Sequence, residues 1–287
     1  MKEFCNLFLC FTVYSFIGWI CETVYCSILF KKLVNRGFLN GPFCPVYGFG
    51  SIILLLILRP VPRNPLFIFI VGMVITTLIE YLTALLLEKL FHAKWWDYSA
   101  NRFNFQGRIC LFNSFLFGIL SVALIFIVEP AASYFIGSLP TTFKNVLFVF
   151  FSVYYFADLA ITVRSMYKLN LRLNALSNAI SVIKEKLDAT GFYNALNIKE
   201  RLEKVHELLE TDRGRAIYKS IENVRARIKQ IENDNKAFQR RIIKAFPGIR
   251  STRYPEILNG IKEKVLKSKI NSNDDSEENN PGSNKID

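Results

Sequence analysis

Acidic side chains inside long apolar segments are the residues of this sequence best able to do chemistry. Glu22, Glu80 and Asp158 each lie past the middle of such a segment, and Glu88 lies nearer to the end of one. Carboxylates are costly in hydrocarbon, so they normally face a bundle interior or a wet cavity and mark ion, proton or ligand sites. The alternative is a structural role, in which each carboxylate pairs with an arginine such as Arg36 or with backbone.

The first of two polar and aromatic loops runs from Asn35 to Gly50, with the sequence NRGFLNGPFCPVYGFG. Pro42 and Pro45 remove backbone donors and clash with the preceding turn, so this stretch cannot be a regular helix throughout. We expect unwound backbone that lines a cavity, because lipid does not tolerate exposed peptide groups. Its free carbonyl and N–H groups can then bind a solute. A plain helix start at a proline is the alternative.

The second loop runs from Lys94 to Asn113, with the sequence KWWDYSANRFNFQGRICLFN. Tryptophan and tyrosine at a membrane boundary are typical of an aromatic belt, but a belt does not require so many amide and charged groups. A pocket for a polar substrate does require several amide and charged groups. The candidate binding residues from both loops and the apolar segments are Glu22, Asn40, Tyr47, Glu80, Trp96, Asp97, Asn104, Arg108, Asn113 and Asp158. No catalytic residue is assigned.

Several classes of enzyme are disfavoured by missing motifs. There is no GxxxxGK[ST], and therefore no P-loop ATPase in this chain. HExxH, GxSxG and GxGxxG are also absent. Six cysteines without a CxxC pair and two histidines argue against zinc or haem, so we expect no cofactor and no metal. A hydrolase that uses paired carboxylates, such as Glu22 with Glu80 or Asp97, stays open because such pairs have no linear signature.

The elements that must position these residues are transmembrane helices, each of which needs roughly 20 mostly apolar residues. Five segments meet or approach that length: Phe4–Phe30, Pro42–Leu58, Pro65–Lys89, Ile109–Glu129 and Phe143–Val163. Residues 1–163 are therefore predicted to form a five-helix transmembrane bundle. Lysine and arginine collect on the side of the two polar loops and the C-terminus, which predicts an external N-terminus and a cytoplasmic C-terminus. The acidic residues then share the cytoplasmic half of the membrane with both loops.

The remaining chain is basic and helical in pattern. Residues 164–270 carry a net charge of +12, against +4 for residues 1–163 and −4 for residues 271–287. Apolar residues at heptad spacing from Leu169 to Leu187 predict one helix from about Phe143 to about Ala189, continuous with the fifth span. Later seams predict a cytoplasmic antiparallel coiled-coil domain, with a homodimer as the alternative, and the tail is predicted to be disordered. The fold class is all-α.

Five blocks carry a family resemblance: GWICE, NRGFLNGPFCPVYGFG, Glu80, WWDYS and NFQGRI, in this order. Over roughly Phe8 to Gly118 the sequence resembles a bacterial family described as putative ABC-transporter permeases, type IV. The resemblance implies a multi-pass protein of the bacterial plasma membrane. It supplies no established binding residue, and an ABC mechanism would require a separate ATPase subunit.

Three functions compete at this point. The first is a permease-like transport component whose cytoplasm-facing pocket binds a polar or lipid-like solute, with a separate ATPase and a homo-oligomer as candidate partners. The second is a membrane scaffold or regulator of envelope processes that acts through its coiled-coil domain. The third is an intramembrane enzyme that acts on lipid head groups. The positive charge of the C-terminal domain suits an anionic lipid surface or an acidic partner better than nucleic acid.

Overall fold

The computed structural model describes residues 2–29, 31, 34–59, 63–188 and 236–267, together with the single residues 219, 222 and 226. The predicted seams between residues 189 and 235 and the predicted tail at 271–287 lie outside this described part. The chain divides into two compact units. The first consists of Met1–Met166 with Ile242–Arg253, and the second of Tyr167–Arg241 with Tyr254–Asp287.

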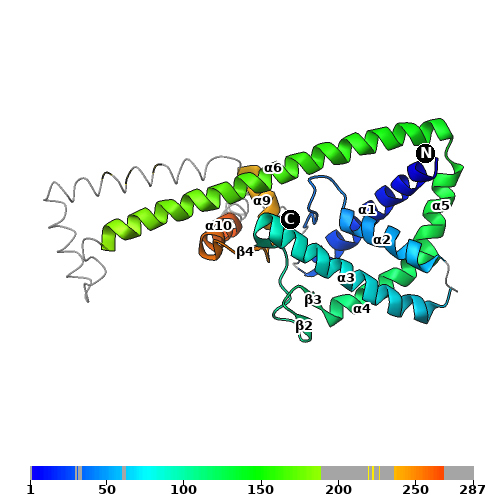
Figure 1. Ribbon diagram of the computed structural model, residues 1–287, viewed down its shortest axis with the longest axis horizontal. Helices are drawn as coiled ribbons and strands as arrows, with labels where there is room; N and C mark the ends of the chain where they lie inside the picture. The colour runs from blue at the N-terminus through cyan, green and yellow to red at the C-terminus, as the bar shows by residue number, and fades with distance from the viewer. Residues whose placement is uncertain are drawn as a thin grey trace, which may run out of the picture. The chain divides into compact units, whose positions relative to one another are not determined.

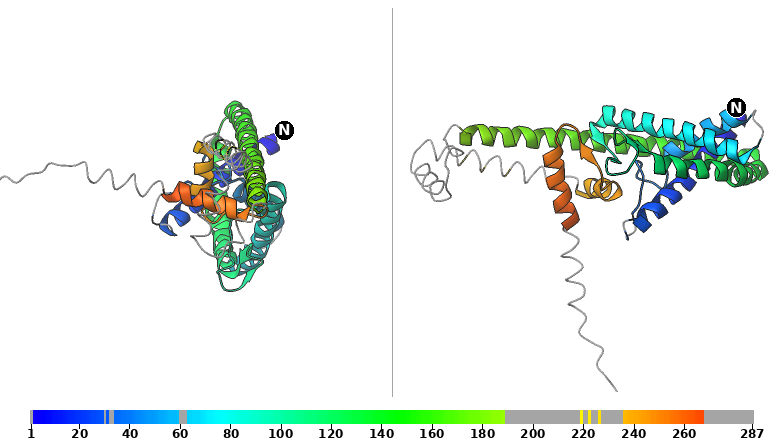
Figure 2. Two further views of the ribbon diagram at one scale, coloured as in Figure 1. Left: turned by 90° about the vertical axis from the view of Figure 1, so that its left-hand side faces the viewer. Right: turned by 90° about the horizontal axis from the view of Figure 1, so that it is seen from below.

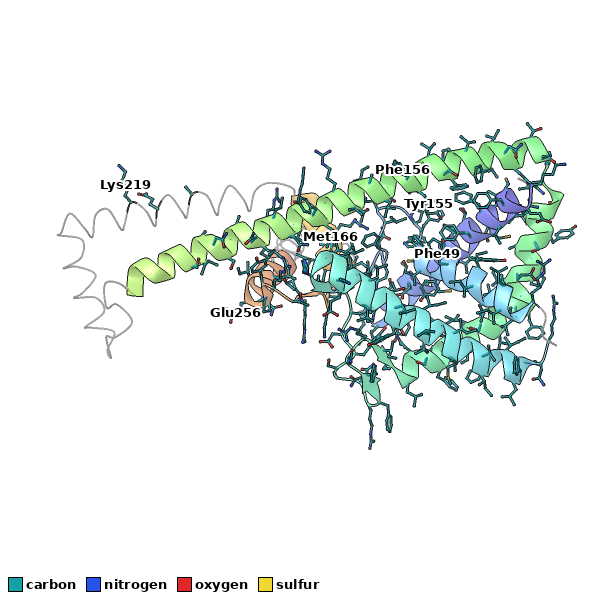
Figure 3. The ribbon with its side chains drawn as sticks, in the orientation of Figure 1. Phe49, Tyr155, Phe156, Met166, Lys219 and Glu256 are labelled. Atoms are coloured by element: carbon teal, nitrogen blue, oxygen red, sulfur yellow. The ribbon has the colours of Figure 1, made fainter. Side chains whose placement is uncertain are left out.

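Long apolar helices dominate the first unit (Figure 1). Among the described residues, four helices are long and apolar enough to cross a membrane: α1 (Lys2–Leu29), α3 (Pro65–Phe91), the segment Leu111–Ser138, and the Thr141–Ser181 part of α6 (Thr141–Asp188). Large apolar side chains cover their outer faces. Phe156 of α6 is 78% exposed and points away from the other helices (Figure 3). Such an outer surface is stable in lipid and not in water.

The second predicted span is a shorter helix, α2 (Pro45–Leu58), with 14 residues. It begins three residues later than the predicted segment, because Pro45 occupies its first turn, where a missing N–H costs nothing. Residues 34–44 before it contain no regular helix. The irregular backbone donates to neighbours instead, as in the hydrogen bond from the Cys44 N–H to the Ser15 carbonyl at 2.9 Å.

Small residues let the helices of this unit approach closely. α1 packs along α2, and α3 packs along α4 (Leu111–Ala123); Figure 2 shows these helices from two further directions. A Cβ on Gly18 of α1 would overlap the ring of Tyr47 on α2. A Cβ on Gly72 of α3 would likewise overlap Ser121 on α4. Both glycines therefore allow the backbones of neighbouring helices to approach closely, as small residues commonly do in membrane bundles.

The fourth span is longer than the sequence predicted. Beyond α4 it continues through a π-helical turn, η1 (Leu124–Val128), into α5 (Glu129–Ser138). The predicted segment ended at Glu129, immediately before Pro130. The π turn accommodates this proline, since the Glu129 N–H bonds to the Leu124 carbonyl five residues back and no donor is needed from the proline.

The loop between α3 and α4 contains short strands, which the all-α prediction lacks. β2 (Asn104–Phe105) pairs antiparallel with β3 (Ile109–Cys110). β1 (Ala93–Lys94) pairs antiparallel with β4 (Arg250–Ser251), which follows α9 (Lys236–Ala245) near the C-terminus. The last residues of α9, from Ile242, and β4 therefore belong to the first unit.

In the second unit, the start of the predicted heptad seam is buried. Leu169, Leu173 and Leu176 of α6 are 4%, 2% and 6% exposed, whereas Ile180 is 47% exposed. The last described helix of this unit is α10 (Pro255–Lys267). Just before it, the Tyr254 hydroxyl donates to the Asn174 side chain at 3.0 Å.

Candidate functional site

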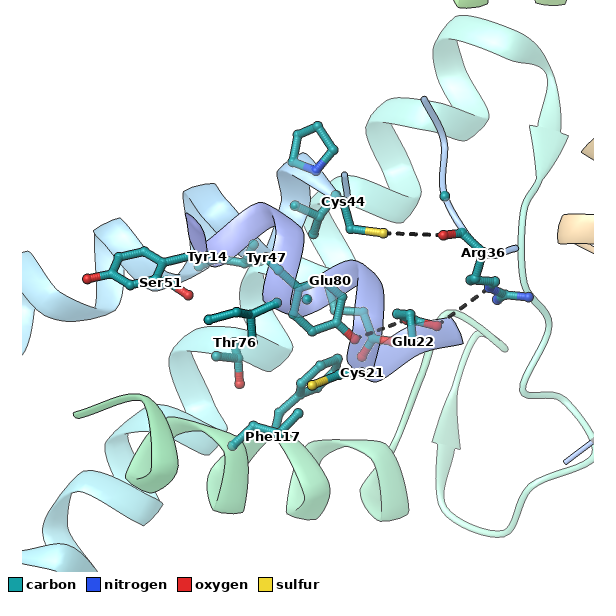
Figure 4. A pocket seen from close by; sticks show the side chains of 18 of the residues that line it. Tyr14, Cys21, Glu22, Arg36, Cys44, Tyr47, Ser51, Thr76, Glu80 and Phe117 are labelled. Carbon is teal, nitrogen blue, oxygen red and sulfur yellow. Dashed lines mark hydrogen bonds and ion pairs between the residues drawn. The ribbon is translucent and has the colours of Figure 1, made fainter. Parts of the chain in front are cut away.

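A cavity of about 300 Å³ lies between α1, α2, α3, α4 and the π turn (Figure 4). Its walls are mostly apolar. Tyr14, Leu54 and Leu124 line one part and belong to one apolar cluster. Glu22 lies eight residues after Tyr14 on α1, about 12 Å along the helix axis. The cavity thus has an apolar end and a polar end.

Glu22 is held at the polar end by groups from three elements. Its Oε1 accepts a hydrogen bond from the Tyr47 hydroxyl at 3.0 Å, and its Oε2 lies 3.5 Å from Nε of Arg36. The Cys26 thiol, one turn further along α1, lies 3.7 Å from the same Oε2. The charge of Glu22 is therefore compensated by an arginine that also lines the cavity.

Glu80 faces the same cavity from α3 and lacks such compensation. Its side chain is 8% exposed, and its Oε1 accepts a hydrogen bond from the Tyr98 hydroxyl at 3.1 Å. Asn113 of α4 donates to that hydroxyl and lies beside the carboxyl. Within the described part of the chain, Oε2 has no hydrogen-bond partner and Glu80 forms no ion pair.

The loop after α3 fixes Tyr98. The indole N–H of Trp96 donates to the Arg108 carbonyl at 2.8 Å, and the Tyr98 N–H donates to the Gly107 carbonyl at 2.8 Å. Gly107 has φ 68°, a left-handed conformation that glycine adopts at little cost. Burial raises the pKa of the Tyr98 phenol well above its usual range, so this group donates a hydrogen bond at neutral pH.

A segment from near the C-terminus, Ile242–Arg253, covers the polar end. Phe246 lines the cavity, is 6% exposed, and packs edge-to-face on Trp95 with ring centroids 4.8 Å apart. Arg36 donates to the Ala245 carbonyl at 2.9 Å and lies 4.6 Å from the Phe246 ring centroid. Arg36 therefore contacts both Glu22 in the cavity wall and this covering segment.

The covering segment is fastened to the loop after α3 at two further points. Arg250 forms an ion pair with Asp97 at 2.9 Å, and the Thr252 N–H donates to the His92 carbonyl at 2.9 Å. Hydrogen bonds from Ser99, with the nearby Arg250 charge, hold the pKa of Asp97 below its usual range. Asp97 is thus a structural anchor at neutral pH and does not line the cavity.

Asp158 and Asn40 form a second polar cluster, away from the cavity lining. The Asp158 carboxylate of α6 is 7% exposed. Its Oδ1 accepts from the backbone and side chain of Asn40 at 2.9 and 2.8 Å, and its Oδ2 accepts from the Gly41 N–H at 2.8 Å. The Thr162 hydroxyl lies 3.4 Å from Oδ1. Asp158 therefore clamps the irregular backbone before α2 onto α6.

The ten sequence-predicted site residues divide into separate groups. The four that line the cavity are Glu22, Tyr47, Glu80 and Trp96. Asn113 donates a hydrogen bond to the Tyr98 hydroxyl. Asn104 forms hydrogen bonds within its own loop, to Asn101 and Gly107. Arg108 pairs with Glu88 at 2.8 Å, outside the cavity lining. The two carboxylates of the first prediction, Glu22 and Glu80, thus share one cavity, while Asp97 and Arg108 serve other contacts.

Sequence reasoning missed Phe246 and Tyr98 as site residues. Tyr98 belongs to the WWDY motif, from which the sequence prediction took Trp96 and Asp97 but not the tyrosine, whose position also suits a membrane belt. No linear signal connects Phe246 with residues some 150 to 220 positions earlier. In the described residues, no group of three or more histidine, cysteine or acidic side chains is arranged to hold a metal ion.

The apolar helices with carboxylates in an internal cavity define a multi-pass helical membrane protein. The chain belongs to the family described as "Putative ABC-transporter type IV", whose model matches residues 9–163, more than half of the chain. No curated protein and no solved structure matches it. The matched region begins within α1 and ends within α6, so Glu22 and Glu80 lie inside it and the covering segment lies outside it.

Proposed function

We propose that this protein is the membrane-embedded, permease-like component of a transport system and binds an amphipathic solute in the cavity between α1 and α4. The observation that carries this proposal is the cavity itself, which combines apolar walls with polar groups at one end. Binding sites for small molecules typically have this composition, in which a few placed polar groups orient a largely apolar ligand. The family description supports a role in transport, and a separate subunit would supply the ATPase.

The transmembrane domain in this proposal has five crossings, over residues 1–163. α2 has 14 residues and spans about 21 Å at 1.5 Å per residue, less than the hydrocarbon thickness of about 30 Å. The irregular residues before Pro45 complete the crossing, shielded from lipid by contacts such as the clamp on Gly41. Discontinuous helices of this kind commonly border solute sites in transporters.

We further propose that the protein lies in the bacterial plasma membrane with its N-terminus outside and the polar end of the cavity toward the cytoplasm. The basic residues of the two polar loops and of residues 164–270 support this orientation. Residues 164–270 then form a cytoplasmic coiled-coil domain that offers a surface for the ATPase or a second copy. A cysteine introduced at Ala100 should escape an impermeant maleimide in intact cells, and its rapid labelling there would contradict the orientation.

A cavity-filling substitution tests the proposed function. Thr76 lines the cavity from α3, whereas Val74 on the same helix is 59% exposed. Full-length protein purified from its own membranes should retain an amphipathic small molecule in native mass spectrometry. Thr76→Trp should lose that molecule and Val74→Trp should keep it. Equal retention by both variants, or no bound molecule in the wild type, would contradict the proposal.

The partner distinguishes transport from scaffolding. If the protein serves transport, an ATPase should copurify with it, and Thr76→Trp should abolish solute-dependent stimulation of ATP hydrolysis by the complex. Val74→Trp provides the matched control for insertion and folding. If the rate of ATP hydrolysis by the complex responds to solute equally well in the wild type and in both variants, the cavity is not the solute site.

A further inference from the structure

The polar end of the cavity has two acidic side chains and one cationic side chain. Its charged lining residues are Glu22, Arg36 and Glu80. Arg36 lies against Glu22 and is also bound to the Ala245 carbonyl, so its charge is already used. Within the described residues Glu80 has no cationic partner.

The Glu80 carboxyl is also incompletely hydrogen-bonded. Its Oε1 accepts from Tyr98, but the buried Oε2 has no partner in the described part of the chain. A buried carboxylate without compensation costs several kcal/mol in general, so such a group either takes up a proton or is stabilised by a cation or several donors. The position that would satisfy Glu80 lies in the cavity, because Glu80 lines it and its other oxygen faces Tyr98.

Aromatic side chains line the same cavity. Tyr47, Trp96, Tyr98 and Phe117 all line the cavity, with the rings of Tyr47 and Phe117 centred 6.0 Å apart. Aromatic faces attract ammonium groups and tolerate their alkyl substituents. Toward Tyr14 the walls are apolar, and they suit a hydrocarbon chain.

We propose that the cavity binds a single-chain amphiphile with a cationic head, whose ammonium group pairs with Glu80 among the aromatic rings while its chain extends toward the apolar end. This inference rests on the proposed function and names the class of its solute. An anionic head would meet the unpaired charge of Glu80 and find Arg36 already engaged. A neutral head would offer the Glu80 carboxyl no cation.

Intrinsic fluorescence can follow binding, because two of the three tryptophans line the cavity. Trp19 is absent from the lining and donates to Asn35 instead. In a Trp19→Phe background, the full chain in nanodiscs is titrated with decyl chains brominated near the head, which quench Trp95 and Trp96. The chains carry a trimethylammonium, a hydroxyl or a carboxylate head, and concentrations stay below micelle formation.

The cationic probe should bind at least about tenfold more tightly than the neutral and anionic probes, as expected for an interaction with a charged group. Glu80→Gln should remove this preference for the cationic head. Glu88→Gln is the matched control, because Glu88 lies on the same helix and pairs with Arg108 outside the cavity lining. It should keep the preference.

Two results separate the inference from the proposed function. If all three probes bind with similar high affinity, or the carboxylate binds most tightly, the inference of a cationic solute is wrong. The proposal that the cavity is a solute site would still stand. Quenching by none of the probes would overturn both. The wild-type comparison of the three heads decides the question even if Glu80→Gln does not fold.

Discussion

Asp158→Asn should release the irregular backbone before α2 from α6. The substitution keeps the side-chain shape and one acceptor, but it can place an NH2 group where Oδ2 accepts the Gly41 N–H at 2.8 Å. A hydrogen bond to a charged group is worth about 1.5–3 kcal/mol, and the Gly41 donor would be left unsatisfied. We therefore expect opening of this segment to become about 2 kcal/mol easier, or roughly 30-fold more frequent at 1.4 kcal/mol per factor of ten.

The buried thiol of Cys44 reports this opening, since it lies three residues after Gly41 and is 9% exposed. Its alkylation rate in nanodiscs, quantified by peptide mass spectrometry, should rise by about the same factor under conditions where opening is rapid and reversible. Cys5, buried near the start of α1 and bonded to the Lys144 carbonyl, serves as an internal control. Thr162→Val should have a smaller effect, because it removes only the 3.4 Å contact with Asp158 and a 3.1 Å hydrogen bond from the Asn40 side chain, which keeps its 2.8 Å bond to Asp158.

The clamp interpretation would be refuted by an unchanged Cys44 rate in Asp158→Asn. Equal acceleration of Cys5 and Cys44 would indicate general unfolding and not local release. Equal effects of Thr162→Val and Asp158→Asn would show that the bond to the Gly41 backbone is not the one that matters.

Three further predictions concern packing, pH and the second unit. Gly18→Ala should destabilise the protein by about 1–3 kcal/mol in thermal or denaturant unfolding, because the new Cβ would overlap the packed ring of Tyr47. At Gly50 the nearest atom to a new Cβ is 4.0 Å away, so alanine should be tolerated there. The folded-state pKa of Asp97 is depressed, so its stabilisation of β4 is complete above the unfolded pKa of about 3.9 and is lost as pH falls through the lower folded value. Amide exchange at β4 should therefore rise in that pH range. An equal rise in Asp97→Asn would contradict the assignment to Asp97. Leu173→Asp should raise protease sensitivity within residues 167–241 far more than Ile180→Asp, since the two side chains are 2% and 47% exposed, and equal sensitivity would contradict the buried seam.

The sequence predicted several features of the first unit because local chemistry determines them. Pro42 and Pro45 disfavour a regular helix through the residues just before α2, and the structure has none at residues 34–44. The apolar segments predicted helices able to cross a membrane for the same local reason. The end of the fourth span was placed too early, because the hydrogen-bond pattern of a π turn has no reliable sequence signature.

Long-range pairing explains what the sequence could not predict about the candidate site. Acidic residues at positions 22 and 80 of apolar segments indicated a buried polar site. No sequence pattern, however, predicted that Tyr47 would hydrogen-bond Glu22 and Tyr98 would hydrogen-bond Glu80. Arg36 was considered as a partner for a buried acid, yet its bond to Ala245 joins residues 209 positions apart. Asp97 and Arg108 lie near the cavity in sequence order and are nonetheless directed to Arg250 and Glu88.

The covering segment also protects an aromatic surface that water would otherwise reach. Phe38, Phe91 and Trp95 form mutual ring contacts at centroid distances of 5.2–6.0 Å, and Phe246 packs on Trp95. A chain shortened to end before Ile242 would keep every transmembrane helix and still expose this cluster. Exposed apolar patches of this kind promote association. The protection of this cluster therefore depends on a segment synthesised about 150 residues after Trp95, and a product truncated before Ile242 would be prone to association.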